Sequence, residues 1–296
     1  MRKCMMIGKR GDIELQFNWI FVFIVGALII AIAVGFVTTQ KKNSDTIISS
    51  QIIRFTRSVI TISSATPGKA EPQPLQKELG LSCDPKSCTS QGCASDLYVR
   101  PRSLNAKIDT KVEAIYGPAI IQGQNLGTWS MEWDMPYHVN NFMYLTSDKA
   151  RDVFVKTGDE AKDSLVDELY LDMPGIMGQK EIVANLAELK NKNNYKVRLV
   201  FVDTPPTLPL SLVPMQSKDL SAINIIPQAG KGFAIGTVKF YQKSVGGFTE
   251  QTGASGELFY LGKPTVYGAV FSDTRDIYLC NLKKSITRLE VVSDLY

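Results

Sequence analysis

The feature that most constrains this chain of 296 residues is an apolar run near its N-terminus, FNWIFVFIVGALIIAIAVGFV, from Phe17 to Val37. From Trp19 onward no residue of the run is charged or strongly polar. At about 1.5 Å of rise per residue, a helix of this length covers the roughly 30 Å hydrocarbon core of a bilayer. It also lacks the polar stripe that a buried helix of a soluble protein normally keeps. We therefore predict a transmembrane helix over residues 17–37.

A cleaved secretory signal is the rival interpretation of this run. The apolar region of such a signal is usually about 7 to 15 residues long and ends at a small-residue cleavage site. Here the run is longer and continues directly into the polar residues Thr38, Thr39, Gln40, Lys41 and Lys42. These differences favour a retained anchor.

The charged flanks of the run predict its orientation. Four basic residues precede it, whereas only two follow closely; the preceding ones are Arg2, Lys3, Lys9 and Arg10. Flanking positive charge tends to stay in the cytoplasm. We expect residues 1–16 to form a cytoplasmic tail and the rest of the chain, after one pass through the cell membrane, to lie outside. The lipid bilayer is then the first partner.

The net charge of +4 arises entirely at the N-terminal end. Residues 1–42 hold six basic and two acidic side chains, so the remaining 27 basic and 27 acidic side chains cancel. A neutral outer part lacks the concentrated basic surface that nucleic-acid binding requires, so we expect no nucleic-acid partner. The content of 44% hydrophobic and 21% charged residues is typical of a folded body rather than a disordered tail.

Cysteine usage gives a second indication of compartment. Cys83, Cys88 and Cys93 are evenly spaced, and Cys280 lies far away near the C-terminus; Cys4 is expected in the cytoplasm as a free thiol. Four exterior cysteines allow three pairings, and each of them joins Cys280 to one member of the cluster. An exterior compartment favours disulfides. The C-terminal segment is therefore expected to be tied to the start of the domain.

Zinc is the competing use of these cysteines. The C-x4-C-x4-C spacing and the distant His138 do not match a usual zinc ligand pattern. The same spacing departs from the cysteine runs of ferredoxins. We predict neither a metal nor another cofactor.

A short motif, Lys9-Arg10-Gly11 followed by Asp12 and Glu14, precedes the apolar run. It resembles the class III signal region of archaeal type IV pilins. The resemblance implies that a prepilin peptidase cuts after Gly11 and that Glu14 helps to pack subunits into a filament. The acid comes third after Gly11, where the family usually places it fifth, and Asp12 replaces a common small or amide residue. The alternative interpretation is basic topology signals followed by acids that a helix N-terminus favours.

Beyond the membrane, apolar residues recur at spacings of four, three, four and three, namely Ile48, Ile52, Phe55, Val59 and Ile62. This seam, defined by those five residues, predicts that the helix continues outward and packs against a second copy, another cell-surface protein or the protein's own domain. The Pro- and Ser-rich residues after it, SSATPGKAEPQP, predict an extended linker. We expect a helical stalk over residues 38–62, a linker over 63–78 and an exterior domain over 79–296.

Hydrophobic patterning predicts the fold of that domain. Candidate strands at Leu97–Val99, Lys111–Ile115 and Ala119–Ile121 suggest a β-rich opening, and GTWSMEWD alternates apolar and polar residues as a strand with a core-facing aromatic side does. The later segments that we expect to be regular are a strand at Arg151–Lys156, helices at Asp159–Leu171 and Glu181–Lys190, a buried strand at Lys196–Asp203, strands at Ala222–Ile226 and Gly236–Tyr241, and a helix from Asp276. Helices between strands favour an α+β or mixed α/β domain.

Catalytic material is sparse. Asp203 and Asp273 each follow an apolar strand, where acids hold metal or substrate in some α/β folds but more commonly serve as turn and capping residues. With the single histidine His138 and no G-x-S-x-G motif, a nucleophilic triad lacks its components. We predict no enzyme activity; only convergence of the three residues in one pocket would favour a surface hydrolase.

The aromatic strand region, the anchor and the C-terminal segment DIYLCNLKKSITRLEVVSDLY together resemble a group of uncharacterised single-pass membrane proteins from archaea. That resemblance implies an anchored exterior domain and brings no activity or functional residue. The leading hypothesis is therefore a binding or assembly protein at the cell surface. The alternative is a pilin-like filament subunit, and a surface hydrolase is third.

Overall fold

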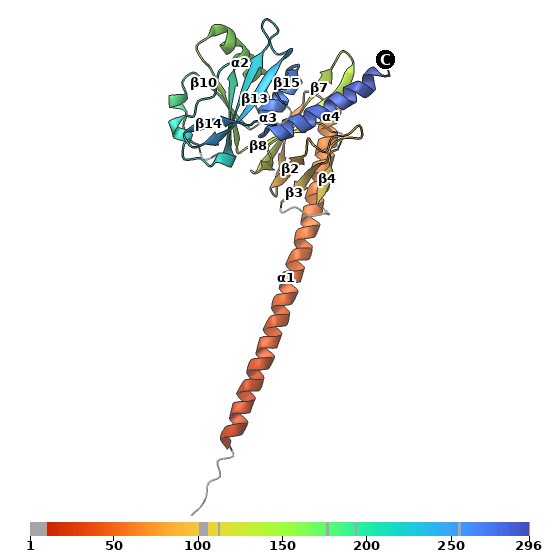
Figure 1. The fold of residues 1–296 in the computed structure, drawn as a ribbon. Coiled ribbons are helices and arrows are strands. Elements are labelled where there is room, and N and C mark those ends of the chain that lie inside the picture. The colour runs from red at the N-terminus through yellow and green to blue at the C-terminus, as the bar shows by residue number, and fades with distance from the viewer. Residues whose placement is uncertain are drawn as a thin grey trace, which may run out of the picture. The chain divides into compact units, whose positions relative to one another are not determined.

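The structure is a computed structural model that describes residues 11–100, 106–111, 113–175, 178–192, 194–253 and 256–295 (Figure 1). The chain divides into two compact parts, Met1–Ser49 and Ser50–Tyr296. Helix α1 (Gly11–Ala65) contributes residues to both, because its 55 residues form one helix without a break. Each part is described by itself below.

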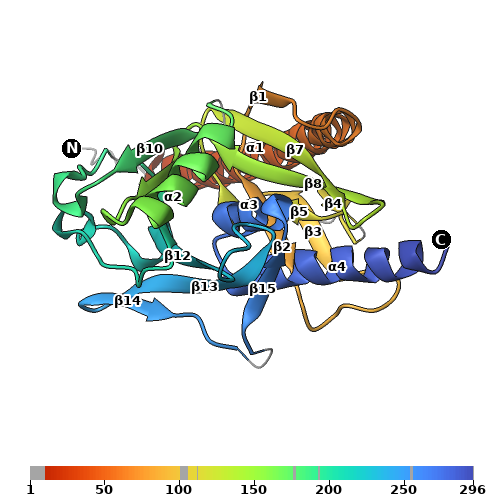
Figure 2. The same cartoon turned by 90° about the horizontal axis from the view of Figure 1, so that it is seen from above.

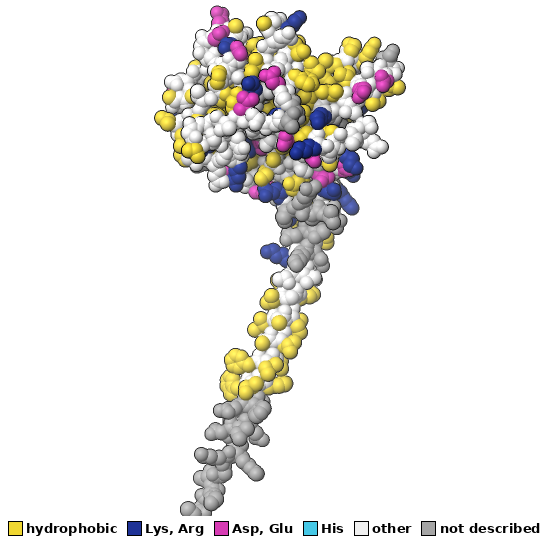
Figure 3. Space-filling view, in the orientation of Figure 1, with side chains coloured by type: hydrophobic (Ala, Val, Ile, Leu, Met, Phe, Trp, Pro, Cys, Tyr) yellow, Lys and Arg dark blue, Asp and Glu magenta, His cyan; other side chains and the backbone are white. Residues whose placement is uncertain are grey.

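The first part consists of the apolar end of α1. Its stretch Trp19–Lys41 has 23 residues with a mean hydropathy of 3.1, and none of its most apolar window is buried. Hydrophobic side chains surround this stretch of the helix in Figure 3. Within the described residues it is the one helix that is long and apolar enough to cross a membrane, a property shared by anchors and signal sequences.

The second part contains the C-terminal end of α1 and three β-sheets. After α1 the strands and longer helices are, in chain order, β1 (Ala70–Pro74), β2 (Leu79–Cys83), β3 (Ser95–Val99), β4 (Lys107–Asp109), β5 (Ile115–Tyr116), β6 (Ile120–Ile121), β7 (Asn125–Asp134), β8 (His138–Ser147), β9 (Ala150–Val155), α2 (Glu160–Asp172), β10 (Gln179–Val183), β11 (Lys196–Val202), β12 (Leu220–Pro227), β13 (Ile235–Ser244), β14 (Gly247–Glu250), β15 (Leu258–Leu261), α3 (Lys263–Phe271) and α4 (Arg275–Ser293). Short 3₁₀ helices lie at η1 (Leu186–Glu188), η2 (Leu210–Leu212) and η3 (Ser217–Asp219).

The largest sheet is mixed, in agreement with the α+β or mixed α/β prediction. Its order is β10-β9-β11-β12-β13-β14, and β15 also pairs with β13. The first four strands are parallel, whereas β13, β14 and β15 are joined antiparallel. All seven residues of β11 are buried, which explains its nearly continuous apolar sequence KVRLVFV.

Two four-stranded sheets complete the domain, in the orders β1-β7-β8-β5 and β4-β3-β2-β6. In the first of them β7 and β8 form a hairpin with a cis bond between Met135 and Pro136 at its turn. Trp129 and Trp133 of β7 are 4% and 1% exposed, which confirms that the aromatic face belongs to the core. The β-rich opening predicted from the sequence is therefore present.

Three hydrophobic clusters hold these layers together. One face of the mixed sheet packs against α2, α3, α4 and the aromatic side of the β7–β8 hairpin (Figure 2). The opposite face is covered by the segments that contain Leu189 and Leu212. A third cluster joins the second face of β8, through Met143 and Leu145, to the sheet β4-β3-β2-β6, called the small sheet below, and to α1. The β7–β8 hairpin therefore contributes to two cores, one on each face.

The C-terminal end of α1 is part of the third cluster. Ile52, Ile53 and Ile60 are at most 8% exposed, and they pack with the strands of the small sheet. The predicted seam divides between two environments. Its members Ile52 and Val59 are buried in the protein's own domain, whereas the other three are partly exposed: Ile48 38%, Phe55 47% and Ile62 61%.

The linker predicted over residues 63–78 is wrong for most of its length. Helix α1 continues to Ala65, and Ala70–Pro74 form β1, which pairs antiparallel with β7. Proline in this stretch suggested irregular chain, but β1 lies at the edge of its sheet, where proline is tolerated because the ladder needs fewer N–H donors. The compact domain therefore starts at Ser50 rather than near Leu79.

The helix predicted at Glu181–Lys190 is also wrong. Residues 179–183 form β10, an edge strand parallel to β9, and only η1 follows. The segment has a helix-forming composition, yet Arg151 of β9 reaches across to Glu181 and pairs with it. This long-range pairing overrides local propensity. Of the strand expected over Lys111–Ile115 only Ile115 is in a strand, with residue 112 outside the described residues.

We expect the α1 contacts to contribute measurably to stability. Replacing Ile53 by Ala should lower the free energy of unfolding by about 2 to 4 kcal/mol, because the residue is 6% exposed and its removal leaves a cavity. Ile62→Ala, on an exposed position of the same helix, is the matched control and should cost well under 1 kcal/mol. Denaturant unfolding of both variants in detergent measures the difference. Equal losses would contradict the packing described for α1.

Candidate functional site

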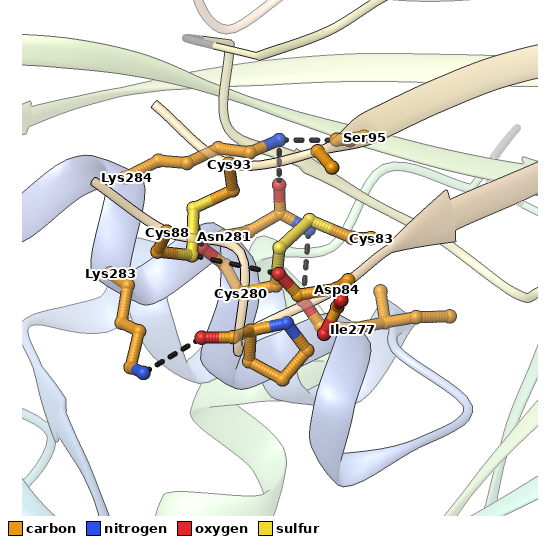
Figure 4. The surroundings of a disulfide bond; sticks show 12 residues. Cys83, Asp84, Cys88, Cys93, Ser95, Ile277, Cys280, Asn281, Lys283 and Lys284 are labelled. Atoms are coloured by element: carbon orange, nitrogen blue, oxygen red, sulfur yellow. Dashed lines mark hydrogen bonds between the residues drawn. A yellow bond between two sulfur atoms is a disulfide. The ribbon is translucent and has the colours of Figure 1, made fainter. Parts of the chain in front are cut away.

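Four of the cysteines, all in the folded domain, lie at disulfide distance, which fits the expected framework (Figure 4). Cys83 pairs with Cys280 across 197 residues of sequence, with their Cα atoms 5.9 Å apart. Cys88 pairs with Cys93, with their Cα atoms 4.0 Å apart. The spacing left three pairings open, and the structure selects the one in which Cys280 of α4 is joined to the end of β2.

The sulfur atoms of Cys88, Cys93 and Cys280 also lie within 4.8 Å of one another. Three thiolates at such distances would suit a zinc ion. Both disulfides use these sulfurs, however, and a sulfur in a disulfide is no longer a thiolate ligand. The arrangement therefore fits a pair of disulfide cross-links better than a metal centre.

Polar contacts join α4 to the same region of the chain. Asn281 accepts a hydrogen bond from the backbone N–H of Ile115 (3.1 Å) and donates one to its carbonyl (2.7 Å), so its amide acts like a strand neighbour of β5. Lys283 donates to the carbonyl of Pro85 at 2.8 Å. Hydrogen bonds from the residues that follow Cys280 thus reinforce the covalent bond.

Lys284 is the most unusual group of this junction. It is 4% exposed, and its ammonium donates to the Ser95 hydroxyl (3.0 Å), the Thr110 carbonyl (2.7 Å) and the Glu113 carbonyl (3.0 Å). Burial lowers the pKa of Lys284 to about 8, although the negative charges of Glu113 and Asp109 act in the opposite direction. A buried lysine of this kind is expensive unless its donors are satisfied, and here they are.

A second buried charge lies in the centre of the mixed sheet. Arg198 of β11 is 1% exposed and donates from Nε to Asp152 of β9 at 2.6 Å and also to the carbonyl of Phe271 at the end of α3. Burial lowers the pKa of Arg198, but the carboxylates of Asp152 and Asp273 outweigh it, so that its pKa is raised and the guanidinium remains charged. The pair fastens two central strands to α3, which is a structural role.

The three residues whose convergence would have favoured a hydrolase do not meet. Asp273 pairs with Lys196 at the first residue of β11 (3.0 Å), whereas Asp203 follows the last residue of that strand and pairs with Lys162 of α2 (3.1 Å). A strand of seven residues separates them by about 20 Å. His138 lies at the start of β8.

The histidine does have a carboxylate partner that the sequence analysis missed. His138 Nδ1 lies 3.1 Å from Asp134 Oδ1 across the β7–β8 turn. Both side chains are about half exposed, and among the described residues no hydroxyl or thiol bonds to the imidazole. The i, i+4 spacing was visible in the sequence, but it becomes meaningful only once the turn at Pro136 is known.

The residues of the signal-like motif are only partly described. Lys9 and Arg10 lie outside the described residues. Gly11, Asp12 and Glu14 lie in the first turns of α1, and only their helical backbone is described. Cleavage after Gly11 and the filament role of Glu14 remain predictions.

No protein family model matches this chain, and neither a curated protein nor a solved structure matches it. The evidence for its function therefore lies in the apolar helix, the folded domain and its surface.

The two disulfides should contribute very differently to stability. In the chain-entropy model, closing a loop across 197 residues stabilises by about 5 kcal/mol, whereas the loop across 5 residues stabilises by only about 2 kcal/mol. We expect the double variant Cys83→Ser/Cys280→Ser to lose roughly twice as much unfolding free energy as Cys88→Ser/Cys93→Ser. Non-reducing peptide mapping confirms which bond remains. A larger loss in the second variant would argue against the described pairing.

Lys284 should give the domain a distinct pH dependence. The folded chain releases this proton near pH 8, below the ordinary lysine value of about 10.4, so between these two values the unfolded state binds more protons. Stability attributable to Lys284 therefore rises with pH across that window, by up to about 1.4 kcal/mol per pH unit. In Lys284→Met this rise is absent. Denaturant unfolding of both proteins at several pH values from 7.5 upward tests it, and parallel curves would refute the shifted pKa.

Proposed function

We propose that this protein is a single-pass membrane protein whose exterior domain takes part in assembly or binding at the cell surface. Helix α1 carries the proposal. The same unbroken helix contains a stretch long and apolar enough to span a bilayer and a face, at Ile52, Ile53 and Ile60, that belongs to the core of the folded domain. A domain that incorporates the continuation of its own apolar helix suits permanent attachment.

The position outside the cell is supported by charge and by cysteine chemistry. The basic flank precedes the apolar stretch, which favours a cytoplasmic N-terminus. Two disulfides in the domain suit an oxidising compartment. The part of the chain after residue 42 has no net charge, and on the face seen in Figure 3 Lys and Arg side chains are interspersed with Asp and Glu.

A second copy of the chain is the partner that the seam fits best. Phe55 and Ile62 remain 47% and 61% exposed on a helix whose other face is buried. Copies anchored in one membrane would present these residues at the same height and in the same orientation. Such preorganisation lowers the entropy cost of association.

A pilin-like filament subunit is the second candidate. The replacement of most of the predicted linker by helix up to Ala65 and by strand β1 supports it, because a flexible linker would suit a tether rather than a filament subunit. In this candidate function a peptidase removes residues 1–11, and the remaining apolar helix packs subunits together. A surface hydrolase is not proposed, because Asp203, Asp273 and His138 lie apart.

The two candidates differ in the fate of one thiol. Cleavage after Gly11 removes Cys4, whereas an intact anchor keeps it as the free thiol beside four paired cysteines. We expect the protein isolated from its native membrane to retain residues 1–11 and to take up one alkylating group under denaturing, non-reducing conditions, as measured by intact mass. A shorter mass without alkylation would replace the anchor proposal by the filament subunit. Gly11→Val would then restore the full mass and the thiol.

A further inference from the structure

The two disulfides lie next to each other where α4 meets the small sheet (Figure 4). The Sγ atoms of Cys88, Cys93 and Cys280 are all within 4.8 Å of one another, although Cys280 is bonded to Cys83 and not to the other two. Thiol–disulfide exchange proceeds by direct attack of one sulfur on another, so it requires sulfur atoms that are close neighbours. The two disulfides meet that requirement.

Each disulfide joins a partly exposed cysteine to a buried one. Cys83 and Cys88 are partly exposed, whereas Cys93 is 2% and Cys280 0% exposed. The two buried members are neighbours, since the Sγ atom of Cys93 also lies 3.7 Å from the carbonyl oxygen of Cys280. If the bond between Cys88 and Cys93 is opened at Cys88, the thiolate that leaves is therefore a buried one beside the second disulfide.

The backbone around Cys93 is held in place by contacts other than its disulfide. The N–H of Cys93 donates to the Lys111 carbonyl at 3.2 Å, and Thr89 and Gly92 exchange two backbone hydrogen bonds of 2.9 and 3.0 Å. Gly92 has a φ of +114°, and a Cβ atom there would lie 2.5 Å from the Lys111 carbonyl oxygen, so glycine is needed for this close approach. Opening the disulfide should therefore leave Cys93 beside Cys280, which α4 holds.

We propose that Cys88 is a reaction site for thiols, and that the reaction moves the covalent attachment of α4 from Cys83 to Cys93. A thiolate attacks Cys88 Sγ and forms a mixed disulfide, while Cys93 leaves as a thiolate with the electron pair of the broken bond. That thiolate attacks Cys280 and expels Cys83, which takes up the proton that the external thiol lost. The products are one mixed disulfide, one internal disulfide and one free thiol, so no separate oxidant or reductant is consumed.

Loop entropy does not oppose this exchange. The original bond closes a loop across 197 residues, and a bond between Cys93 and Cys280 closes one across 187. In the chain-entropy model two loops of such similar length constrain the unfolded chain almost equally. Helix α4 thus remains cross-linked while the end of β2 is released with a free thiol.

The reagent that this site suits is a small thiol compound. Cys88 is only partly exposed and lies in a turn closed by the pairing of Thr89 with Gly92, which leaves less room for a cysteine on the surface of a folded protein. The proposal does not involve α1, so it is independent of the assembly role proposed above.

The variant Cys88→Ser tests the internal step, because it leaves the Cys93 thiol beside the second disulfide without any external reagent. The full-length variant is incubated in detergent at mildly alkaline pH, quenched with acid, alkylated with N-ethylmaleimide at weakly acidic pH and digested with pepsin for non-reducing peptide mapping. We expect the label on Cys93 in part of the chains and on Cys83 in the others, with Cys280 never labelled. The matched control Cys88→Ser/Cys93→Ser should keep Cys83 and Cys280 bonded and unlabelled.

Reduced glutathione at millimolar concentration, added to the unmodified full-length protein, provides a second measurement that does not depend on folding of a variant. Glutathione on Cys88, N-ethylmaleimide on Cys83 and a peptide linked through Cys93 and Cys280 should appear together. Retention of the bond between Cys83 and Cys280 in every Cys88→Ser chain, with Cys93 alone labelled, would overturn the proposal. So would a glutathione adduct on Cys88 that leaves the free thiol on Cys93, or no reaction of the folded protein with glutathione.

Discussion

Helix α4 makes most of its polar and covalent contacts with a stretch of chain about 170 to 200 residues earlier. Cys280 bonds to Cys83, Asn281 exchanges two hydrogen bonds with Ile115, and Lys284 donates to Ser95, Thr110 and Glu113. Those partners lie on β2, on β5 and in the segment between them. The two-residue strands β5 and β6 at the edges of the two four-stranded sheets are therefore not held by their own short ladders alone.

The same helix also joins two hydrophobic cores. Ile277 belongs to the cluster that contains α1 and the small sheet, whereas the next residue, Tyr278, belongs to the cluster on the mixed sheet and donates its hydroxyl to the Phe259 carbonyl. A helix can serve two cores when neighbouring side chains leave it about 100° apart. Helix α4 thus packs against both the mixed sheet and the sheet β4-β3-β2-β6.

Sequence patterning predicted the elements whose surroundings are uniform. Strand β11 is buried on both faces and appears as a nearly unbroken apolar run, and β7 alternates because its aromatic residues face one core. Uniform burial also explains why helix α3 is not predicted from the sequence. All of its residues from Thr265 to Phe271 are buried, so it has no polar face, and its β-branched and aromatic residues do not indicate a helix. Short edge strands such as β1 and β10 depend on long-range pairing that a local pattern cannot contain.

Buried polar groups are the part of the candidate sites that the sequence could not predict. The four cysteines restricted the covalent framework to three pairings, but only the fold could choose among them. Arg198 and Lys284 gave no signal, because a charged residue in an amphipathic pattern is expected at the surface. Their burial becomes favourable only when distant acceptors are already in position. For Arg198 the acceptor is the Asp152 carboxylate, and for Lys284 the acceptors are the oxygens of Ser95, Thr110 and Glu113. Asp273 is similar, since its partners Lys196 and Ala119 come from different parts of the chain.

The seam of α1 is not centred on the face of the helix that the domain buries. At about 100° per residue, its five apolar residues centre roughly 80° away from the centre of the face that is buried. The buried face includes Thr56 and Ser63, which a hydrophobic pattern omits. Thr56 bonds to the Ile52 carbonyl of its own helix, and Ser63 bonds to the Thr128 hydroxyl of β7, so both are buried without an unpaired hydroxyl. The domain therefore takes the more polar side of the stripe, and the apolar remainder, Phe55 and Ile62, is left as the surface that a second chain can cover.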